Sequence, residues 1–591
     1  METLKHECGV ALIRLKKPIS FFEKKYGTSR YALNKLYLLM QKQHNRGQEG
    51  AGAACVSLEA EPGQEFIFRE RKEGKNAIPE LFEEIGKSIA QTPTDENEPF
   101  IGECYMGHLR YSTTGRAGIT YVHPHLRRNN YRQNTLALCG NFNLTNVDEI
   151  FQHLKSQGQH PRRTSDTTIL LEQLGSCLDT YNDSVEDILK NSMPLWDGGF
   201  VICGIVGDGR TFAARDPWGI RSAFFYEDDE IIVIASERPA IQTVMNVKSG
   251  DIKELQPGEA LIIDSQANIS LSQIVKPTNV KQCSFERIYF SRGNDADIYR
   301  ERKALGRGVV PAILKTVDND LANSVFSFIP NTAEVAFWGM NEYLKEYLDQ
   351  EKYQKIVAAG ASITDDTLKE IISQRVRIEK VAIKDIKLRT FISESGKRDE
   401  LSSHVYDITY DSIVPHRDNL IVIDDSIVRG TTLKQSIITI LSRLDPKKLV
   451  IVSSAPQIRY PDFYGIDMAD ISQLIAFKAM IELVSKKRLT EVYKKCLAQV
   501  DAPKGEMKNY VCELYAPFSD EQISAEIARI VTPDTVKCDV DIIFQTRETL
   551  REVCSGHKGD WYFTGEYPTD GGLRMLNASF IEFYQRTHPE L

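Results

Sequence analysis

Cys8 and Gly9 lie close to the beginning of the 591-residue sequence, after the polar segment Met1–Glu7. Removal of that segment would leave Cys8 with both a thiol and a free α-amino group. A cysteine attacks as its thiolate, and a free pKa of about 8.5 leaves little thiolate at neutral pH. An α-amine titrates at about 7.7–8.0, so it could take the thiol proton and return it to a leaving amine. The pair predicts an amino-terminal nucleophile; on these residues alone, a small buried cysteine in a first strand is the alternative.

A second set of reactive side chains follows the apolar run at residues 420–423. These side chains are Asp424, Asp425, Ser426, Arg429, Gly430, Thr431 and Thr432. The two aspartates would stand at the carboxyl end of a strand, and the glycine would allow a tight turn before a helix. Backbone N–H groups and the helix dipole there favour a phosphate, and the carboxylates can accept hydrogen bonds from sugar hydroxyls. The pattern predicts a site for a phosphorylated sugar, the alternative being aspartates that only cap the helix.

The elements that must position these residues change character near residue 280. Up to about residue 275, short alternating strands such as 200–206 and 230–235 are interrupted by helical patterns such as 31–43, which predicts sheets covered by helices. From about 285, apolar strands alternate with amphipathic helices, the signature of a parallel sheet. We therefore expect domains at 8–275 and 276–500, with a leader at 1–7 and a carboxyl-terminal extension at 501–591.

Composition excludes several classes of protein. Hydrophobic residues make up 42% and charged residues 26% of the chain, and the net charge is −9. An acidic chain of this kind argues against a dedicated nucleic-acid binder. No apolar run is long enough to span a membrane, and the leader lacks the apolar stretch of a signal peptide. The eleven cysteines form no CxxC pair, which predicts free thiols in a reducing, cytoplasmic compartment.

The loop from Leu420 to Thr432 closely resembles the phosphoribosyl-pyrophosphate (PRPP) loop of type I phosphoribosyltransferases. Together with Cys8, the sequence of this loop is most similar to that of the glutamine phosphoribosylpyrophosphate amidotransferase family. The resemblance runs from Cys8 to about residue 470 and implies two domains. The first would be an α+β amino-terminal-nucleophile (class II) glutaminase with an αββα sandwich, and the second an α/β type I phosphoribosyltransferase domain with a parallel sheet.

The resemblance assigns roles in the first domain. Residues 43–52 are similar to the family's Gln-His-Arg-Gly-Gln stretch, which implies that Arg46 orders the region around the nucleophile. Residues 106–115 match the glutamine-site segment, so that Arg110 would bind the α-carboxylate of glutamine, a task suited to a guanidinium. By the same resemblance, Asp166 would meet the α-ammonium group.

Residues 140–146 resemble the oxyanion-hole segment His-Asn-Gly-Asn-Leu-Thr-Asn. This similarity implies that the side-chain amide of Asn141 and the backbone N–H of the next residue stabilise the developing oxyanion. The next residue is Phe142 where the family has glycine. A phenylalanine still carries the N–H, so we expect an intact hole in a reshaped pocket.

In the second domain the resemblance implies that PRPP is bound by the loop residues named above together with Arg389, which belongs to a mobile loop in the family. It also implies Mg²⁺, bound mostly by pyrophosphate, with Thr332, Asp424 and Asp425 as the protein's metal-site candidates. The basic Arg-x-Lys of the family is replaced by residues 405–410. Four cations could substitute for it: Lys384, Lys387, Lys397 and Arg398.

Some family members carry a four-iron cluster on four cysteines. Here only Cys283 stands near such a position, Asp462 occupies a second, and residues 560–569 lack the paired cysteines. Three missing thiolates lead us to expect no iron–sulfur cluster.

The function implied by the resemblance is transfer of ammonia from glutamine to PRPP, giving 5-phosphoribosylamine. Its partners would be these small molecules, with purine nucleotides as inhibitors, in a homo-oligomer that contacts neither nucleic acid nor membrane. The altered residues 405–410 and Asn331 motivate an alternative, a divergent paralogue with glutaminase activity that senses PRPP or nucleotide with weakened or lost transfer. A plain glutaminase with a scaffolding second domain is also open, whereas a hexosamine-forming enzyme conflicts with the PRPP loop.

Overall fold

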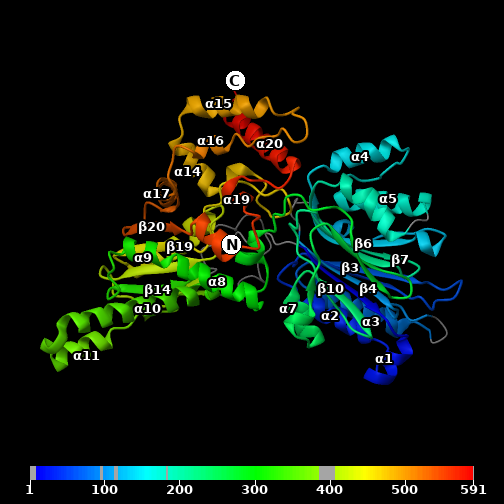
Figure 1. Cartoon of the computed structure of the whole chain (residues 1–591), viewed down its shortest axis with the longest axis horizontal. Helices are drawn as coiled ribbons and strands as arrows, with labels where there is room; N and C mark the ends of the chain where they lie inside the picture. The colour runs from blue at the N-terminus through cyan, green and yellow to red at the C-terminus, as the bar shows by residue number, and fades with distance from the viewer. Residues whose placement is uncertain (1–7, 94–96, 112–117, 182–183, 385–405, 590–591) are drawn as a thin grey trace.

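The computed structural model describes residues 8–93, 97–111, 118–181, 184–384 and 406–589. Within these ranges the chain forms two bodies that lie side by side, with the carboxyl-terminal helices packed on the second body (Figure 1). The expected leader at 1–7, the substitute cations Lys387, Lys397 and Arg398, and the PRPP-site candidate Arg389 all lie outside the described residues.

The first body is built on two stacked antiparallel sheets. One has the strand order β11 (Lys253–Glu254), β9 (Phe224–Glu227), β10 (Ile231–Ala235), β1 (Gly9–Leu15), β4 (Cys104–Arg110), β2 (Gly50–Val56) and β3 (Ile67–Glu73). The other has the order β13 (Ile269–Gln273), β12 (Glu259–Ile263), β8 (Thr211–Arg215), β7 (Gly198–Val206), β6 (Leu136–Leu144) and β5 (His125–Arg127). Apolar side chains of both sheets, such as Leu12 and Val201, form a shared core between them.

Helices cover the outer face of each sheet. The first sheet is covered by α1 (Ile19–Tyr26), α2 (Tyr31–Lys42), α3 (Ala77–Gln91) and α7 (Arg238–Met245). The second is covered by α4 (Val147–Ser156), α5 (Asp166–Tyr181) and α6 (Val185–Ser192). Short turns of helix join these elements: η1 (Ile119–Tyr121), η2 (Arg132–Asn134), η3 (Met193–Leu195) and η4 (Ser249–Asp251). The order of layers is helix, sheet, sheet, helix, which confirms the predicted αββα sandwich.

The second body contains a parallel sheet of five strands. Their order is β15 (Arg377–Ile378), β14 (Ser324–Phe328), β18 (Asn419–Asp424), β19 (Lys448–Ser453) and β20 (Asp539–Phe544). A small hairpin of β16 (Ala382–Lys384) and β17 (Tyr406–Ile408) stands beside it. The parallel sheet confirms the predicted fold class. Its edge strand β20 comes from the stretch after residue 500, so that stretch is part of this body rather than a separate appendage.

Helices pack on both faces of the parallel sheet. One face buries Phe326 and Ile421 against a group that includes α9 (Val310–Thr316) and α10 (Glu334–Ala359). The other buries Leu420 and Leu449 against a group that includes η8 (Leu433–Ile438), α14 (Ile475–Leu483) and α17 (Asp520–Val531). The remaining helices are η5 (Glu286–Phe290), α8 (Ala296–Gly308), η6 (Gly360–Ser362), α11 (Asp365–Ser373), α13 (Thr439–Leu441), η9 (Ser442–Leu444), η10 (Ile471–Gln473), α15 (Lys486–Leu497), α16 (Cys512–Tyr515), α18 (Arg547–Val553), α19 (Trp561–Thr564) and α20 (Asp570–Thr587).

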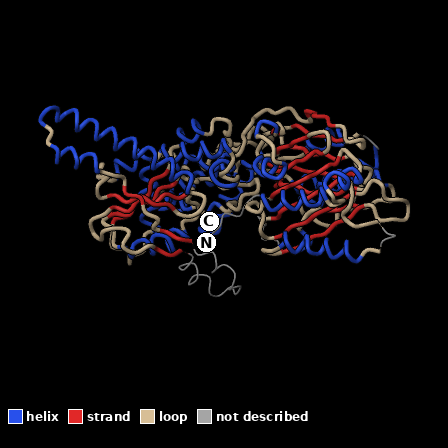
Figure 2. Tube along the Cα trace, turned by 90° about the horizontal axis from the view of Figure 1, so that it is seen from below, coloured by secondary structure: helices blue, strands red, loops and turns tan. Residues whose placement is uncertain are grey.

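The helices of the second body include a projecting pair. Helices α10 and α11 project from the second body as an arm (Figures 1 and 2). None of the helices in the described ranges combines the length and apolarity that crossing a membrane requires.

The beginning of the last helix, α20, ties the two bodies together. Thr569, which caps this helix, donates a 2.6 Å hydrogen bond to Asp197 of the first body and lies 3.0 Å from the hydroxyl of Tyr464 in the second. The N–H of Gly571 also donates to Asp197, and Arg574 pairs with Glu149 on α4. The chain's last described helix therefore contacts both halves.

Candidate active sites

Cys8 lies one residue before strand β1, at the end of the first sheet. The register pairs Gly9 with Leu109 of β4, which places Cys8 level with Arg110. The N–H of Tyr111 donates to the Cys8 sulfur at 3.5 Å, and the thiol is 3.7 Å from the Tyr111 carbonyl. Cys8 as a residue is half-buried, and its sulfur is held by the backbone of Tyr111.

The surroundings keep the Cys8 thiol protonated. Burial raises its pKa to about 11, and the nearby carboxylates of Asp166 and Glu49 act in the same direction. The Tyr111 N–H and the charge of Arg110 oppose this shift without cancelling it. Because the thiolate is the nucleophile, a cysteine in this setting needs a base close by.

Arg110 and Asp166, the two predicted contacts for glutamine, lie near the nucleophile on different elements. Arg110 ends β4, is buried, and stands over the ring of Tyr121 at 5.7 Å. Asp166 opens α5, and its carboxylate accepts the Thr167 N–H at 2.8 Å. Both charges act on the Cys8 thiol, so the structure brings together a thiol, a cation and an anion, the set that an α-amino acid substrate requires.

The hydrogen-bonding pattern between β6 and β7 determines the direction of the Phe142 N–H. Phe142 pairs with Phe200, whose N–H and carbonyl both bond Asp216 on the far side of β7. The pair Phe142–Phe200 is therefore not hydrogen-bonded, and in an antiparallel ladder the N–H of Phe142 must point away from β7. This orientation leaves the N–H directed out of the ladder, as an oxyanion donor requires.

Asn141 projects from the opposite face of the same strand. Side chains alternate along a strand, so Asn141 shares a face with Ala137 and Cys139, which pack in the core between the two sheets. Cys8 adjoins the other of those sheets, and Asn141 is 3% exposed. The predicted oxyanion residues thus offer a side chain and a backbone group from two sides of β6.

Three histidines lie beside this region, and the sequence analysis gave them no role. His108 is on β4, His125 is on β5, and His123 precedes β5. Burial is the main cause that lowers all three pKa values, to about 3 for His108, to about 4 for His125, and well below the ordinary value for His123. The imidazoles are therefore neutral at physiological pH.

Arg46 lies in the seam between the two bodies rather than against the sulfur. Its guanidinium bonds Glu237 of the first body at 2.7 Å and Glu286 of η5 at 2.6 Å, and all three side chains are buried. Burial works to lower the pKa of Arg46, but the two carboxylates outweigh it and raise the pKa. The Cβ of Arg46 also lies beside Gly9, so Arg46 can order the start of β1 while joining the halves.

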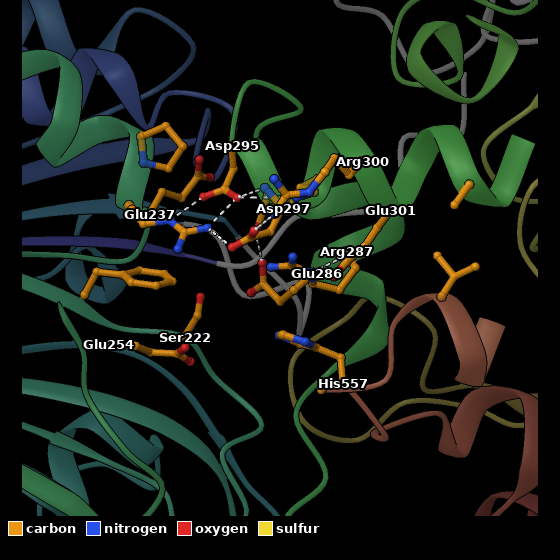
Figure 3. A pocket seen from close by; sticks show the side chains of 18 residues that line it. Ser222, Glu237, Glu254, Glu286, Arg287, Asp295, Asp297, Arg300, Glu301 and His557 are labelled. Carbon is orange, nitrogen blue, oxygen red and sulfur yellow. Dashed lines mark hydrogen bonds and ion pairs between the residues drawn. The ribbon is translucent and has the colours of Figure 1, made fainter. Parts of the chain in front are cut away.

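The same seam contains a cavity of about 460 Å³. Figure 3 shows carboxylates and guanidinium groups from both bodies around it. Arg238 pairs with Asp295 and Asp297 across the seam, and Arg287 pairs with Glu301 on its far wall. The two bodies are thus held by compensated charges, in an arrangement that includes Arg46.

The predicted phosphate loop follows β18 as expected. Gly430 has φ +74°, a left-handed conformation that glycine adopts without strain, and Thr431 and Thr432 open the next helical segment. The Arg429 guanidinium hydrogen-bonds the Asp467 carbonyl at 2.9 Å and pairs with its carboxylate at 3.3 Å. A pocket of about 140 Å³ lies here, and its lining includes Asn331, Thr332, Lys384, Asp424, Asp425, Ser426, Arg429, Gly430 and Thr432.

The pKa values of the adjacent carboxyl groups of Asp424 and Asp425 are both raised. Burial raises the pKa of Asp425 to about 6, against the lowering effect of Ser426 and Arg302. Burial, followed by the charge of Asp425, raises the pKa of Asp424 well above its ordinary value. Two adjacent carboxylates in a pocket favour a bound cation or hydrogen-bond donors that would relieve the repulsion.

Two cations near this pair come from distant parts of the chain. Lys384 ends β16 and lines the pocket, which places one of the four suggested substitutes for the missing basic residues at the site. Arg302, on α8, is buried, and its charge acts on Asp425. Its guanidinium donates to the carbonyls of Arg287 and Ser291, and burial lowers its pKa to about 10.

Cys283, which the sequence places near a cluster position of some family members, is buried against aromatic side chains. Its sulfur lies 2.8 Å from the Tyr562 hydroxyl. Asp462 accepts a 2.9 Å hydrogen bond from the Trp561 indole. These contacts show what surrounds the two side chains; the expectation that no iron–sulfur cluster binds stays a prediction.

The structure gathers most of the predicted residues into two sites. Cys8, Arg110 and Asp166 lie together in the first, and residues 424–430 with Thr332 and Thr432 line the second. The sequence analysis missed Glu237, Glu286 and the histidines, because no local signal marks a partner that lies about 190–240 positions away. The sequence order His-Pro-His at 123–125 is a local signal that could have drawn attention to two of the histidines.

Comparisons with known proteins agree with this arrangement. Residues 127–243 match the family model of a glutamine amidotransferase domain. A protein of Methanocaldococcus jannaschii named amidophosphoribosyltransferase is 27% identical over 76% of this chain and 86% of its own length. One of Bacillus subtilis with the same name is 27% identical over 76% of this chain and 82% of its own length.

Solved structures support the fold of the whole chain. The glutamine PRPP amidotransferase of B. subtilis, complexed with ADP and GMP, is 23% identical with a TM-score of 0.63, and the match covers 95% of this chain and 98% of that one. A structure described as the allosteric regulatory enzyme of purine biosynthesis is 24% identical with a TM-score of 0.64, covering 96% and 99%. Both matches span the two bodies.

Proposed function

We propose that this chain, a homologue of the amidophosphoribosyltransferases, transfers the amide nitrogen of glutamine to PRPP. The products would be 5-phosphoribosylamine, glutamate and pyrophosphate, as in the first step of purine synthesis. The observation that carries the proposal is that one chain holds both half-sites: a thiol beside a cation and an anion, and an aspartate pair that leads into a phosphate loop.

The first half-reaction needs a base close to the Cys8 thiol, which burial keeps protonated. In the proposed mechanism, cleavage after Glu7 frees the Cys8 α-amine, which takes the thiol proton. The sulfur then bonds the glutamine amide carbon, and Asn141 and the Phe142 N–H stabilise the oxyanion. The α-ammonium returns its proton to the leaving nitrogen, ammonia departs, and water hydrolyses the thioester to glutamate.

The second half-reaction would take place at the end of β18. The N–H groups of residues 430–432 and the helix that follows would hold the 5-phosphate, while Asp424 and Asp425 accept hydrogen bonds from the ribose hydroxyls. Ammonia that crosses the seam would attack carbon 1 as the bond to pyrophosphate breaks. Lys384 lines this pocket and supports the proposal by supplying positive charge for the phosphates.

Mg²⁺ fits this edge of the sheet as a partner of the substrate. Proteins commonly hold Mg²⁺ with one or two carboxylates together with substrate phosphates and water. Among the described residues no group of three or more His, Cys, Asp or Glu side chains is placed to hold a metal by itself. Asp424, Asp425 and the Thr332 hydroxyl would therefore hold it together with PRPP, and the bound ion would neutralise charge on the pyrophosphate.

The remaining partners are also part of the proposal. The B. subtilis structure was determined with ADP and GMP, which supports purine nucleotides as inhibitors of this chain. The composition and the free thiols support a cytoplasmic location, and the resemblance supports a homo-oligomer. The alternative of a sensor that has lost transfer has no such support, because the relatives compared here carry the transferase name.

The test is to supply glutamine and PRPP to the purified protein and measure glutamate and pyrophosphate together. We expect equal amounts of the two products, and pyrophosphate release with high free ammonia in place of glutamine. Cys8→Ser should lower glutamine-dependent turnover by about 10⁴-fold or more, as loss of a nucleophile does, and leave the ammonia-dependent rate within about twofold.

Three results would contradict the proposal in different ways. Glutamine hydrolysis without pyrophosphate release from either nitrogen source, in a protein that binds PRPP, would favour the sensor. Glutamine hydrolysis at the same rate with and without PRPP, with no release of pyrophosphate, would favour a plain glutaminase. Full glutamine-dependent turnover by Cys8→Ser would show that another group is the nucleophile.

A further inference from the structure

His123 bridges the two segments that form the glutamine half-site. Its Nδ1 accepts the N–H of Gly140, the residue before Asn141, at 3.3 Å. Its Nε2 lies 2.9 Å from the hydroxyl of Thr167, the residue after Asp166. One side chain thus joins the strand that carries the oxyanion donors to the helix start that carries the predicted ammonium contact.

The two hydrogen bonds fix the protonation of the ring. A backbone N–H can only donate, so Nδ1 must be unprotonated and Nε2 must carry the hydrogen that it donates to Thr167. The Thr167 hydroxyl is then free to donate onward to Asp166, 3.4 Å away. Only the neutral Nε2–H form of His123 makes both contacts, which a positively charged ring could not do.

Stacked rings hold His123 in this place. His108 lies against one side at 4.2 Å between ring centroids, and the Phe142 ring is stacked at 5.6 Å. His108 also contacts the Gly140 carbonyl through Nε2 at 3.1 Å, so both backbone groups of Gly140 are bound by imidazoles. A Cβ on Gly140 would come within 2.5 Å of the Phe142 ring, so the glycine is what admits this stack.

We propose that His123 is a positioning residue for glutamine hydrolysis, which sets the distance between the oxyanion donors on β6 and Asp166 on α5. This inference rests on the proposed function of the first body. Hydrogen-bond donors stabilise an oxyanion only when they are placed to within a few tenths of an ångström. A displacement of about 1 Å can lower the rate about 10²-fold. Thr167 completes the connection, and Phe142 contributes its ring as well as its N–H.

The groups that face His123 favour its neutral state. His108 and Arg110 come from β4, His125 from β5, and Arg71 from β3, and the charges of these groups lower the pKa of His123 in addition to burial. The carboxylate of Asp166 is reached through Thr167. The connection should therefore persist over the whole neutral range of pH.

The test compares three variants in glutamine hydrolysis and in ammonia-dependent pyrophosphate release. His123→Phe keeps a ring in the stack and loses both hydrogen bonds, so we expect kcat with glutamine to fall about 10- to 100-fold. His123→Gln can accept from Gly140 and donate to Thr167, so it should recover most of that loss. His153→Gln is the control, because His153 is an exposed residue of α4 that takes no part in this connection, and it should retain the wild-type kcat.

Ammonia-dependent release monitors the rest of the molecule and should be unchanged in all three variants. Thermal unfolding should be unchanged in the control, whereas His123→Phe should unfold at a lower temperature because Gly140 and Thr167 lose a buried partner. If His123→Phe fails to fold, Thr167→Val takes its place, since it removes one hydroxyl from a buried site. Loss of one hydrogen bond of about 1 kcal/mol should then raise the KM for glutamine about fivefold.

The inference is overturned if His123→Phe, or Thr167→Val in its place, matches the wild type in kcat and KM, or if His123→Gln is no better than His123→Phe. Failure of the proposed function would look different, because the wild-type protein would then hydrolyse no glutamine at all.

Discussion

The two half-sites solve opposite electrostatic problems. In the first, burial keeps the Cys8 thiol protonated and three histidines neutral, so the pocket contains polar groups with little net charge of their own. In the second, two aspartates adjoin each other in a pocket; burial raises both pKa values, and the charge of Asp425 raises the pKa of Asp424 further. Among the described residues, the first site presents a protonated thiol that needs a base, whereas the second presents two carboxylates that a cation or hydrogen-bond donors would stabilise.

This difference indicates what each site must receive before it can react. The thiol needs a base, which the α-amine of Cys8 would supply after cleavage. The aspartate pair needs positive charge or hydrogen-bond donors, which a Mg²⁺–PRPP complex would bring. One site would thus be completed once, by a change in the chain, and the other in every turnover, by its substrate.

The largest expected effect tests whether the α-amine of Cys8 is the proton acceptor of the first site. A chain that begins at Cys8 should hydrolyse glutamine at least about 10³-fold faster than one in which a resistant extension still precedes Cys8, because only the former has the α-amine. Intact mass identifies the terminus, and the rate of alkylation of Cys8 at pH 7.5 reports the thiolate. Equal rates for the two forms would mean that some other group takes the proton. The ammonia-dependent rate of both forms is the control.

The seam that separates the two sites offers the next largest effect. Arg46→Gln should destabilise the protein by about 3–5 kcal/mol, because it leaves Glu237 and Glu286 buried without their cation. Denaturant unfolding measures the change. Arg307→Gln, which removes an exposed pair with Glu346, is the control and should change stability by less than about 1 kcal/mol. A similar small change for Arg46→Gln would show that water reaches the seam.

The aspartate pair should show a gain of stability together with a loss of binding. Asp424→Asn with Asp425→Asn should weaken PRPP binding in calorimetry by about 100-fold or more, since charge-assisted hydrogen bonds and metal contacts are lost. Binding equal to that of the wild type would mean that the sugar lies elsewhere.

The same variant should be more stable than the wild type at pH 7.5, by about 1–3 kcal/mol. A carboxyl whose pKa is raised in the folded state holds its proton there more tightly than in the unfolded chain. The wild type therefore loses stability as the pH rises from about 4 through about 6, and the advantage of the variant should shrink again as the pH falls below 5. Thermal unfolding at several pH values measures this; a difference independent of pH would contradict it.

The smallest expected effect concerns the carboxyl-terminal tie to the first body. Thr569→Val removes the hydrogen bond to Asp197, the contact with Tyr464 and the side-chain cap of α20, and should cost about 2 kcal/mol of stability. Because Asp197 also bonds Thr145, just beyond β6, glutamine hydrolysis should slow by a factor of about two to five while the ammonia-dependent rate is retained. Thr587→Val, at the far end of α20, is the control. An equal decrease of both rates would indicate general loosening instead.

The sequence predicted the second site better than the first, for a physical reason. Asp424 to Thr432 form one continuous loop, so that strand, turn and helix signals lie side by side, and the positive φ of Gly430 confirms the expected turn. Periodicity likewise predicted helix-covered sheets in the first body and a parallel sheet in the second, whereas the αββα order of layers came from the family resemblance. Strand β20 was missed because it is a half-buried edge strand with alternating acids at Asp539 and Asp541.

The first site depends on pairings that no local pattern encodes. The direction of the Phe142 N–H follows from the ladder with β7 and from the bonds of Asp216 to Phe200. His123 meets Thr167, 44 positions away, and Arg46 meets Glu286, 240 positions away. The family resemblance indicated Asn141, Arg110 and Asp166 as candidates. It did not indicate His123, because His123 lies outside the motifs that carry the resemblance.

Under the proposed function, the position of α20 makes residues 569–574 indirect participants in glutamine hydrolysis. Thr569 and Gly571 both hydrogen-bond Asp197, 372 and 374 positions earlier in the sequence, and Asp197 in turn bonds Thr145, just beyond β6. A truncation before Thr569 that spares every side chain around Cys8 and Asp424 would still remove these bonds. Substitutions in this stretch should accordingly be assayed for impaired amide hydrolysis.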